Sequence, residues 1–188
     1  TASALLAHDK PLIVSGAGMM SSLIVRCAAQ IATALKEAGK DVGLVLSVPE
    51  ANSIGLAMIG SAGSFEDAMQ RVEEDRRLTA VVIETDLYYR TDRQSASSFL
   101  NNCNKVILLD SLENDTTPEV DYVLPAGTFA ESSGTLVNNE GRAQRFYQVF
   151  QPGNDMKSSW AWLDMMIHHS ETARPFDDII TEMAAAIP

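Results

Sequence analysis

A carboxylate and a guanidinium flank a glycine at Glu140-Gly141-Arg142, late in the chain. Glycine permits a tight turn, and two opposite charges beside such a turn can pair or clamp the neighbouring backbone. Asn138 and Gln144 place an amide on either side, and amides both donate and accept hydrogen bonds. The pattern is compatible with two roles, the anchoring of a hairpin and the binding of a ligand.

Two further acids, Glu84 and Asp86, follow an apolar run that begins at Thr79. Such a run is typical of a buried strand, and α/β proteins place functional groups just beyond the carboxyl ends of their strands. The same acids could instead be a helix cap and a turn residue ahead of Tyr88-Tyr89. The sequence leaves both interpretations open.

A phosphate site is suggested by Gly16-Ala17-Gly18, which lies between an expected strand and an expected helix. Backbone N–H groups can meet a phosphate in that geometry. However, the third glycine of the dinucleotide motif would fall at Ser21, and no acidic residue closes the next strand. The alternatives are a plain tight turn and an independent nucleotide-binding enzyme.

Metal ligands are sparse. The two cysteines, Cys27 and Cys103, lie far apart and have no CxxC partner and no histidine at ligand spacing. The pattern therefore predicts neither a zinc site nor an iron–sulfur cluster within this chain. Both residues are interpreted as small apolar thiols in a reducing compartment.

Composition excludes several classes of partner. The 188 residues include 14 Lys and Arg against 25 Asp and Glu, a formal net charge of −11. Such a surface repels nucleic acid and anionic lipid heads, so we expect neither as a partner. No apolar run approaches the roughly 20 residues that span a bilayer, so no direct membrane insertion is expected. Because the sequence opens on Thr1 with no signal segment, we expect a piece of a longer polypeptide.

Short apolar runs alternate with helical patterns, which is typical of βαβ units. The sequence therefore predicts an α/β fold with a mainly parallel, Rossmann-like sheet and helices on both faces. The expected strands cover residues 11–15, 42–46, 79–84, 105–110 and 121–124, and the expected helices cover 20–35, 64–77, 91–102, 157–169 and 177–187. Gly39 is placed to end the first helix, Ser64 with Asp67 has capping-box form, and Thr91 is expected to open another helix. Residues 52–63 are left unassigned.

A β-hairpin or extended arm is expected to turn near Asn139-Glu140-Gly141. Apolar and polar residues nearly alternate from Ala143 to Phe150, which is the period of a strand, and Pro152-Gly153 ends the pattern. We expect an α/β domain at 1–150 and a C-terminal helical extension at 151–188.

The segment from Asp121 to Gln144 also resembles a known family. Its order is Val-Leu-Pro-Ala followed by Glu131, Gly134, Thr135, Asn138, Glu140, Gly141, Arg142 and Gln144. This order resembles the molybdopterin oxidoreductase family. The form Asn-x-Glu-Gly-Arg-x-Gln looks most like its respiratory branch, the large iron–sulfur subunits of NADH:quinone oxidoreductase (complex I), of which this would be a C-terminal fragment.

The resemblance implies a specific role for the strand that ends at Glu84. In catalytic relatives a Gly-x-Asn-Pro-like turn follows that strand and approaches a pterin cofactor that carries molybdenum or tungsten. Here the turn reads Glu84-Thr85-Asp86-Leu87, and a carboxylate beside a phosphate-rich cofactor would be repulsive. The resemblance therefore implies a scaffold without a bound cofactor. If a pterin does bind, its ligands would be Asn138, Glu140, Gly141, Arg142 and Gln144.

The implied parent passes electrons from NADH through FMN and its 2Fe-2S and 4Fe-4S clusters to quinone, with proton translocation. Its cluster ligands would lie outside this fragment, which is expected to hold no cofactor and to be non-catalytic. The implied partners are other peripheral-arm subunits, including the NADH/FMN-binding subunit, at the cytoplasmic face of the bacterial inner membrane. The alternative is the cofactor-binding domain of an active molybdopterin-dependent oxidoreductase.

Overall fold

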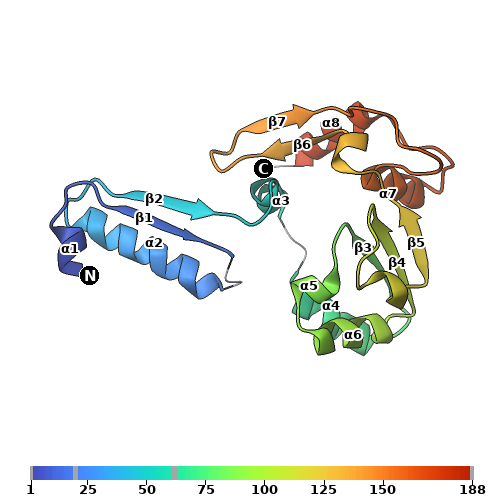
Figure 1. Cartoon of the computed structure of the whole chain (residues 1–188), viewed down its shortest axis with the longest axis horizontal. Helices are drawn as coiled ribbons and strands as arrows, with labels where there is room; N and C mark the ends of the chain where they lie inside the picture. Colours follow the sequence, from blue (N-terminus) through green and yellow to red (C-terminus); the bar gives the residue numbers. More distant parts are fainter. Residues whose placement is uncertain (1, 19–20, 61–62, 187–188) are drawn as a thin grey trace. The chain divides into compact units, whose positions relative to one another are not determined.

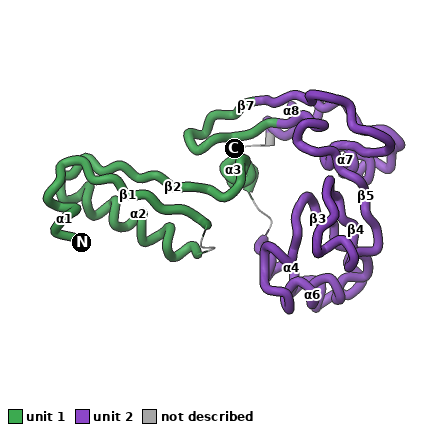
Figure 2. The backbone as a smooth tube through the Cα atoms, in the orientation of Figure 1, with its two compact units in different colours: residues 1–60, 135–144 green, residues 61–134, 145–188 purple. Residues whose placement is uncertain are grey.

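The computed structural model describes residues 2–18, 21–60 and 63–186. Met20 and Ile187, which the sequence placed in helices, lie outside these residues. Contacts divide the chain into two compact units that interleave along the sequence (Figure 2): unit 1 is Thr1–Gly60 with Thr135–Gln144, and unit 2 is Ser61–Gly134 with Arg145–Pro188. The expected division at residue 150 follows element type rather than contacts, and it stays a prediction.

Unit 1 is built on one parallel strand pair. Its elements are α1 (Ala2–Leu6), β1 (Leu12–Gly16), α2 (Ser22–Glu37), β2 (Gly43–Ser47) and α3 (Ser53–Ile59). The strands run parallel from Leu12 opposite Gly43 to Gly16 opposite Ser47, and α2 lies beside them (Figure 1). Gly39, at φ 79°, follows α2 in the left-handed conformation that glycine adopts without strain, as expected of a helix stop.

Unit 2 holds a three-stranded parallel sheet. Its first elements are α4 (Phe65–Glu74), β3 (Thr79–Ile83), α5 (Leu87–Arg90), α6 (Arg93–Asn102), β4 (Lys105–Asp110), the 3-10 turn η1 (Thr117–Glu119), β5 (Tyr122–Pro125) and the 3-10 turn η2 (Phe129–Glu131). The strand order is β3-β4-β5. Side chains from one sheet face pack with α4 and α6 to form the core: Val72, Val82, Leu87, Ala96, Phe99, Leu100, Val106 and Leu108. The α/β class with parallel sheets is therefore confirmed.

Local signals set several helix starts. The Ser64–Asp67 capping box is present, with Ser64 N–H donating to the Asp67 carboxylate at 2.6 Å. The expectation that Thr91 opens α6 is wrong, because the cap is Asp92, whose carboxylate accepts from Ser95 N–H at 3.0 Å. An ionised carboxylate is the stronger acceptor for the unpaired N–H groups of a first turn.

The chain ends in a hairpin and two helices. Strands β6 (Gly134–Val137) and β7 (Ala143–Phe146) form a two-stranded sheet, and α7 (Ser159–His168) and α8 (Phe176–Ala186) follow. The strand ends at Phe146 rather than at Phe150, because the backbone N–H groups of Gln148 and Val149 bond to Ser133 and Ala130 instead of to a strand partner. No helix in the described ranges is long and apolar enough to cross a membrane.

Candidate functional site

The hairpin tip is built by Asn138. Its backbone N–H donates to the Arg142 carbonyl at 3.2 Å, and its carbonyl accepts from Gly141 N–H at 2.9 Å. Its side-chain oxygen also accepts from the backbone N–H groups of Glu140 and Arg142, at 3.0 and 2.9 Å. Gly141 takes φ 75°, where a side chain would be strained. The expected anchoring role is therefore carried by Asn138 and Gly141.

A second asparagine, which the sequence did not single out, secures the hairpin within unit 1. The Asn52 side-chain oxygen accepts from Val137 N–H at 2.9 Å, and Asn139 donates to the Leu46 carbonyl at 3.5 Å. The Asn52 amide lies so close to Gly55 that a Cβ there would meet it at 2.3 Å. The only available signal was a small residue three places after an asparagine, which is too common to be diagnostic.

Three motif side chains at the tip remain exposed. Within the residues that the structure describes, Glu140, Arg142 and Gln144 make no side-chain hydrogen bond or ion pair. The interpretation that Glu140 and Arg142 pair across the turn is therefore not what this conformation shows. An open hollow of about 560 Å³ lies beside the tip, lined by Val48, Pro49, Glu50, Ala51, Asn138, Asn139 and Glu140. Its two carboxylates make it a poor place for a phosphate.

The glycine pair after β1 has a packing explanation at its first position. A Cβ on Gly16 would lie 2.5 Å from the Ser47 carbonyl oxygen, and that oxygen accepts from Ala17 N–H at 3.1 Å. Gly16 therefore lets the ends of β1 and β2 approach, as a tight turn requires. A Cβ on Gly18 would meet nothing within 4 Å, so packing does not explain that glycine. The phosphate site stays a prediction.

The turn after β3 is closed on itself. Glu84 takes φ 45°, the left-handed region that favours glycine, at the place where the family resemblance implies one. Its N–H donates to the Leu109 carbonyl at 2.7 Å, and its carboxylate accepts from the hydroxyl of the buried Ser159. The turn thus keeps a glycine-like backbone while its carboxylate is bound to the first turn of α7.

Asp86 is bound in the same way. It caps α5 by accepting from Tyr88 N–H at 3.1 Å, and it accepts from the Thr116 hydroxyl at 2.7 Å. Thr116 is fully buried and in turn accepts from Leu87 N–H at 2.9 Å. The interpretation of Asp86 as a cap is confirmed, and both acids after β3 are engaged by the chain itself.

The motif residues Glu131, Gly134 and Thr135 lie before the hairpin tip and support the local fold. Glu131 is buried and accepts from the Thr128 hydroxyl and N–H at 2.7 and 3.0 Å, and these bonds hold its pKa below the usual value. Gly134 lies against the Phe146 ring, where a Cβ would be 2.5 Å away. Thr135 is half-buried in β6. These residues connect the segment after β5 to the hairpin.

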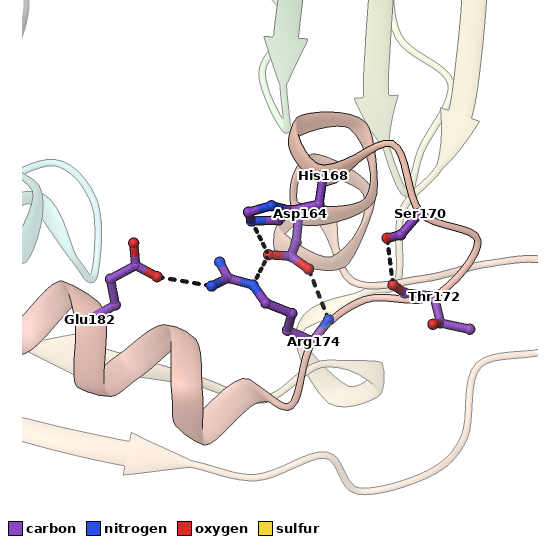
Figure 3. Close-up of polar contacts among 6 residues, drawn as sticks. All are labelled: Asp164, His168, Ser170, Thr172, Arg174 and Glu182. Atoms are coloured by element: carbon purple, nitrogen blue, oxygen red, sulfur yellow. Dashed lines mark hydrogen bonds and ion pairs between the residues drawn. The ribbon is translucent and has the colours of Figure 1, made fainter.

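A buried carboxylate on α7 binds Arg174, which in turn binds Glu182 on α8 (Figure 3), and these contacts were not predicted from the sequence. Asp164 on α7 is 5% exposed and accepts from the Arg174 N–H and Nε, both at 2.8 Å. The Arg174 N–H, helped by its guanidinium, holds the pKa of Asp164 below the usual value. Arg174 also donates to Glu182 at 3.0 Å, and His168 Nε2 lies 3.5 Å from Asp164. An aspartate amid Trp, Leu and Met residues was the available signal.

No group of three or more His, Cys, Asp or Glu side chains suited to a metal ion occurs among the described residues. Cys27 is exposed on α2, and Cys103 donates its thiol to the Phe99 carbonyl at 3.3 Å. Burial raises the pKa of the Cys103 thiol, which disfavours the thiolate that binds iron. An iron–sulfur cluster takes four such ligands, so the donor set of this chain does not fit one.

Comparison with known proteins agrees with the motif. The model of the molybdopterin oxidoreductase family matches residues 2–167. The chain is 44% identical over 167 residues to the G subunit of NADH-quinone oxidoreductase from Pseudomonas fluorescens, covering 86% of this chain and 18% of that protein. The same subunits of Shewanella oneidensis and Salmonella typhimurium are 38% and 37% identical over 95% and 98% of this chain, and 21% of each is covered. The chain thus spans about a fifth of these curated relatives. It belongs to the molybdopterin oxidoreductase family.

Proposed function

We propose that this chain is a non-catalytic scaffold domain in the large iron–sulfur subunit of a respiratory NADH:quinone oxidoreductase. The names of the relatives support the choice of complex, since NADH-quinone oxidoreductase subunits match over 86% to 98% of the chain. The proposed non-catalytic role rests on one observation, the turn after β3, whose carboxylates are bound within the protein.

That turn is where catalytic relatives are expected to bring backbone close to the cofactor. Glu84 and Asp86 instead direct their carboxylates into the protein, to Ser159 and to Thr116 with Tyr88 N–H. Opening the turn for a phosphate-rich cofactor would break these bonds and leave buried hydroxyls without acceptors. It would also bring two negative charges toward the cofactor phosphates. The geometry therefore favours a packing role.

In the proposed parent, electrons pass from NADH through FMN and 2Fe-2S and 4Fe-4S clusters to quinone, and proton translocation is coupled to the transfer. The clusters are held outside this chain. The domain would pack inside the large subunit and against other peripheral-arm subunits, among them the NADH/FMN-binding subunit. The complex would lie at the cytoplasmic face of the bacterial inner membrane.

Metal and pterin analysis of the full-length subunit, purified from its native host, tests the proposal. We expect iron without stoichiometric molybdenum, tungsten or pterin. Stoichiometric pterin with molybdenum or tungsten would overturn it in favour of an active molybdopterin-dependent oxidoreductase. In that case Arg142→Gln should lower the pterin content, whereas Arg26→Gln on α2 serves as a matched loss of charge outside the tip.

A further inference from the structure

Helix α8 meets the rest of unit 2 through ion pairs and one aromatic pair, and its Ile179 and Ile180 are only half-buried. Between Phe176 and Ala185 no residue is buried. The Phe176 ring packs on the Trp160 ring at 5.0 Å. The Arg145 guanidinium lies 5.2 Å from the Phe176 ring and 2.6 Å from the Asp177 carboxylate. Arg174 adds its 3.0 Å bond to Glu182 one turn further on (Figure 3).

Helix α7 is held quite differently. It buries Ser159, Ala161 and Asp164, and Ser159 is tied to the end of β3 through Glu84. Arg174 belongs with α7 because its N–H and Nε are both bound to the buried Asp164. Fixed and weakly held parts of the chain therefore meet at Pro175, directly before α8.

The ion pairs that hold α8 are open to solvent. The side chains of Arg145 and Asp177 are 35% and 74% exposed, and those of Arg174 and Glu182 are 40% and 70% exposed. Salt screens exposed pairs strongly, and each stabilises only weakly even without salt. No buried aliphatic side chain of α8 replaces them among the described residues. Moreover, the Trp160 Nε1 beneath Phe176 is buried without a hydrogen-bond partner in the part of the chain that the structure describes, so opening would hydrate it.

We propose that α8 is a strap that opens locally at Pro175 as ionic strength rises, while α7 and the β3-β4-β5 sheet stay folded. Arg145 and Arg174 are its two latches. Opening uncovers the Trp160 ring and frees the acidic first turn of α8. This device is independent of the proposed function, because it uses contacts within unit 2 alone.

Amide hydrogen exchange of the 188-residue chain, followed by mass spectrometry at low and high salt, tests the proposal. From about 20 mM to about 500 mM NaCl we expect exchange in α8 to quicken by about 3- to 10-fold, the effect of losing two exposed ion pairs. Exchange in α7 should be unchanged. Equal quickening of both helices would mean global unfolding and would overturn the strap. Exchange of α8 at the rate of an unfolded peptide under both conditions would overturn it too, since no latch would then exist.

Two matched variants distinguish the Arg145–Asp177 ion pair from a general effect of negative charge in the first turn of α8. Asp177→Asn removes the partner of Arg145, whereas Asp178→Asn removes the neighbouring first-turn charge, which has no side-chain partner among the described residues. Asp177→Asn should quicken α8 exchange about 3-fold at low salt and reduce its salt response, because one latch is lost. Asp178→Asn should do neither. Equal effects of the two variants would show that helix-terminal charge, not the Arg145 latch, holds α8.

Discussion

The turn after β3 and the tip of the β6–β7 hairpin use charged residues in opposite ways. At the β3 turn the carboxylates of Glu84 and Asp86 are bound to Ser159, Tyr88 N–H and Thr116. At the hairpin tip Glu140 and Arg142 are exposed, and only the backbone around them is fixed, by Asn138. The first region uses its charges to stabilise its own fold, and the second presents them to its surroundings.

The difference shows what a motif can and cannot specify. The motif Asn-x-Glu-Gly-Arg-x-Gln contains residues that fix the fold and residues that do not. Asn138 and Gly141 fix the backbone of the turn, whereas the side chains of Glu140, Arg142 and Gln144 are exposed. Being part of a family pattern therefore does not say whether a side chain supports the fold. Its hydrogen-bond partners do.

The largest effect on stability should come from Asp86→Ala. It removes the α5 cap and leaves the hydroxyl proton of the fully buried Thr116 without its acceptor. We expect a loss of about 2–4 kcal/mol in the free energy of unfolding, measured by chemical denaturation. Asp86→Asn, which keeps a side-chain oxygen, should lose less than half as much. A loss below about 0.5 kcal/mol for the alanine variant would place Asp86 with the exposed tip residues and contradict the difference between the two regions.

Asn138→Ala should have the largest effect within the hairpin tip. The variant loses the two side-chain bonds to the N–H groups of Glu140 and Arg142. These groups are exposed and can turn to water, so we expect a loss of about 1–2 kcal/mol in the free energy of unfolding. Asn138→Asp, which retains an acceptor, is the control. If both variants lose the same amount, the side-chain acceptor does not fix the turn.

Much of the fold could be predicted from the sequence because its signals are local. Apolar runs predicted the strands, and Ser64 with Asp67 predicted a helix start, since both depend on neighbouring residues. The short α3 and α5 were not predicted, because one or two helical turns carry too little periodicity. The left-handed Glu84 and the Asp164–Arg174 bond were also missed, since distant contacts stabilise them.

Acid titration should test whether the Glu131 carboxylate supports the fold. Because bonds from Thr128 lower the pKa of Glu131 in the folded protein, its carboxylate stabilises the fold above the unfolded value near 4.5. That contribution is lost as the pH falls through the lower, folded pKa. Glu131→Gln should therefore be less stable than the unsubstituted chain at pH 7. The difference between their free energies of unfolding should shrink in acid. If the free energies of unfolding of Glu131→Gln and the unsubstituted chain change in parallel with pH, the Glu131 carboxylate does not stabilise the fold as proposed.

The strain at Glu84 can be measured by comparing two substitutions. Glu84→Gly loses the bond to Ser159 but relieves the left-handed backbone, so its net change should lie within about 1 kcal/mol of zero. Glu84→Ala loses the same bond and keeps a Cβ at φ 45°, so it should be about 1 kcal/mol less stable than the glycine variant. Equal stability of the two would mean that the turn relaxes out of the left-handed region.

The smallest effects should come from the exposed tip charges. Arg142→Gln and Glu140→Gln each remove a charge that has no side-chain partner among the described residues, so the free energy of unfolding should change by less than about 0.5 kcal/mol. A loss above about 1 kcal/mol would show that the tip is held by its charges as the β3 turn is. If these variants are stable in the isolated chain but destabilise the full-length subunit, Arg142 and Glu140 serve contacts that form only there. That result would make the hairpin tip a place where this chain contacts the rest of the full-length subunit.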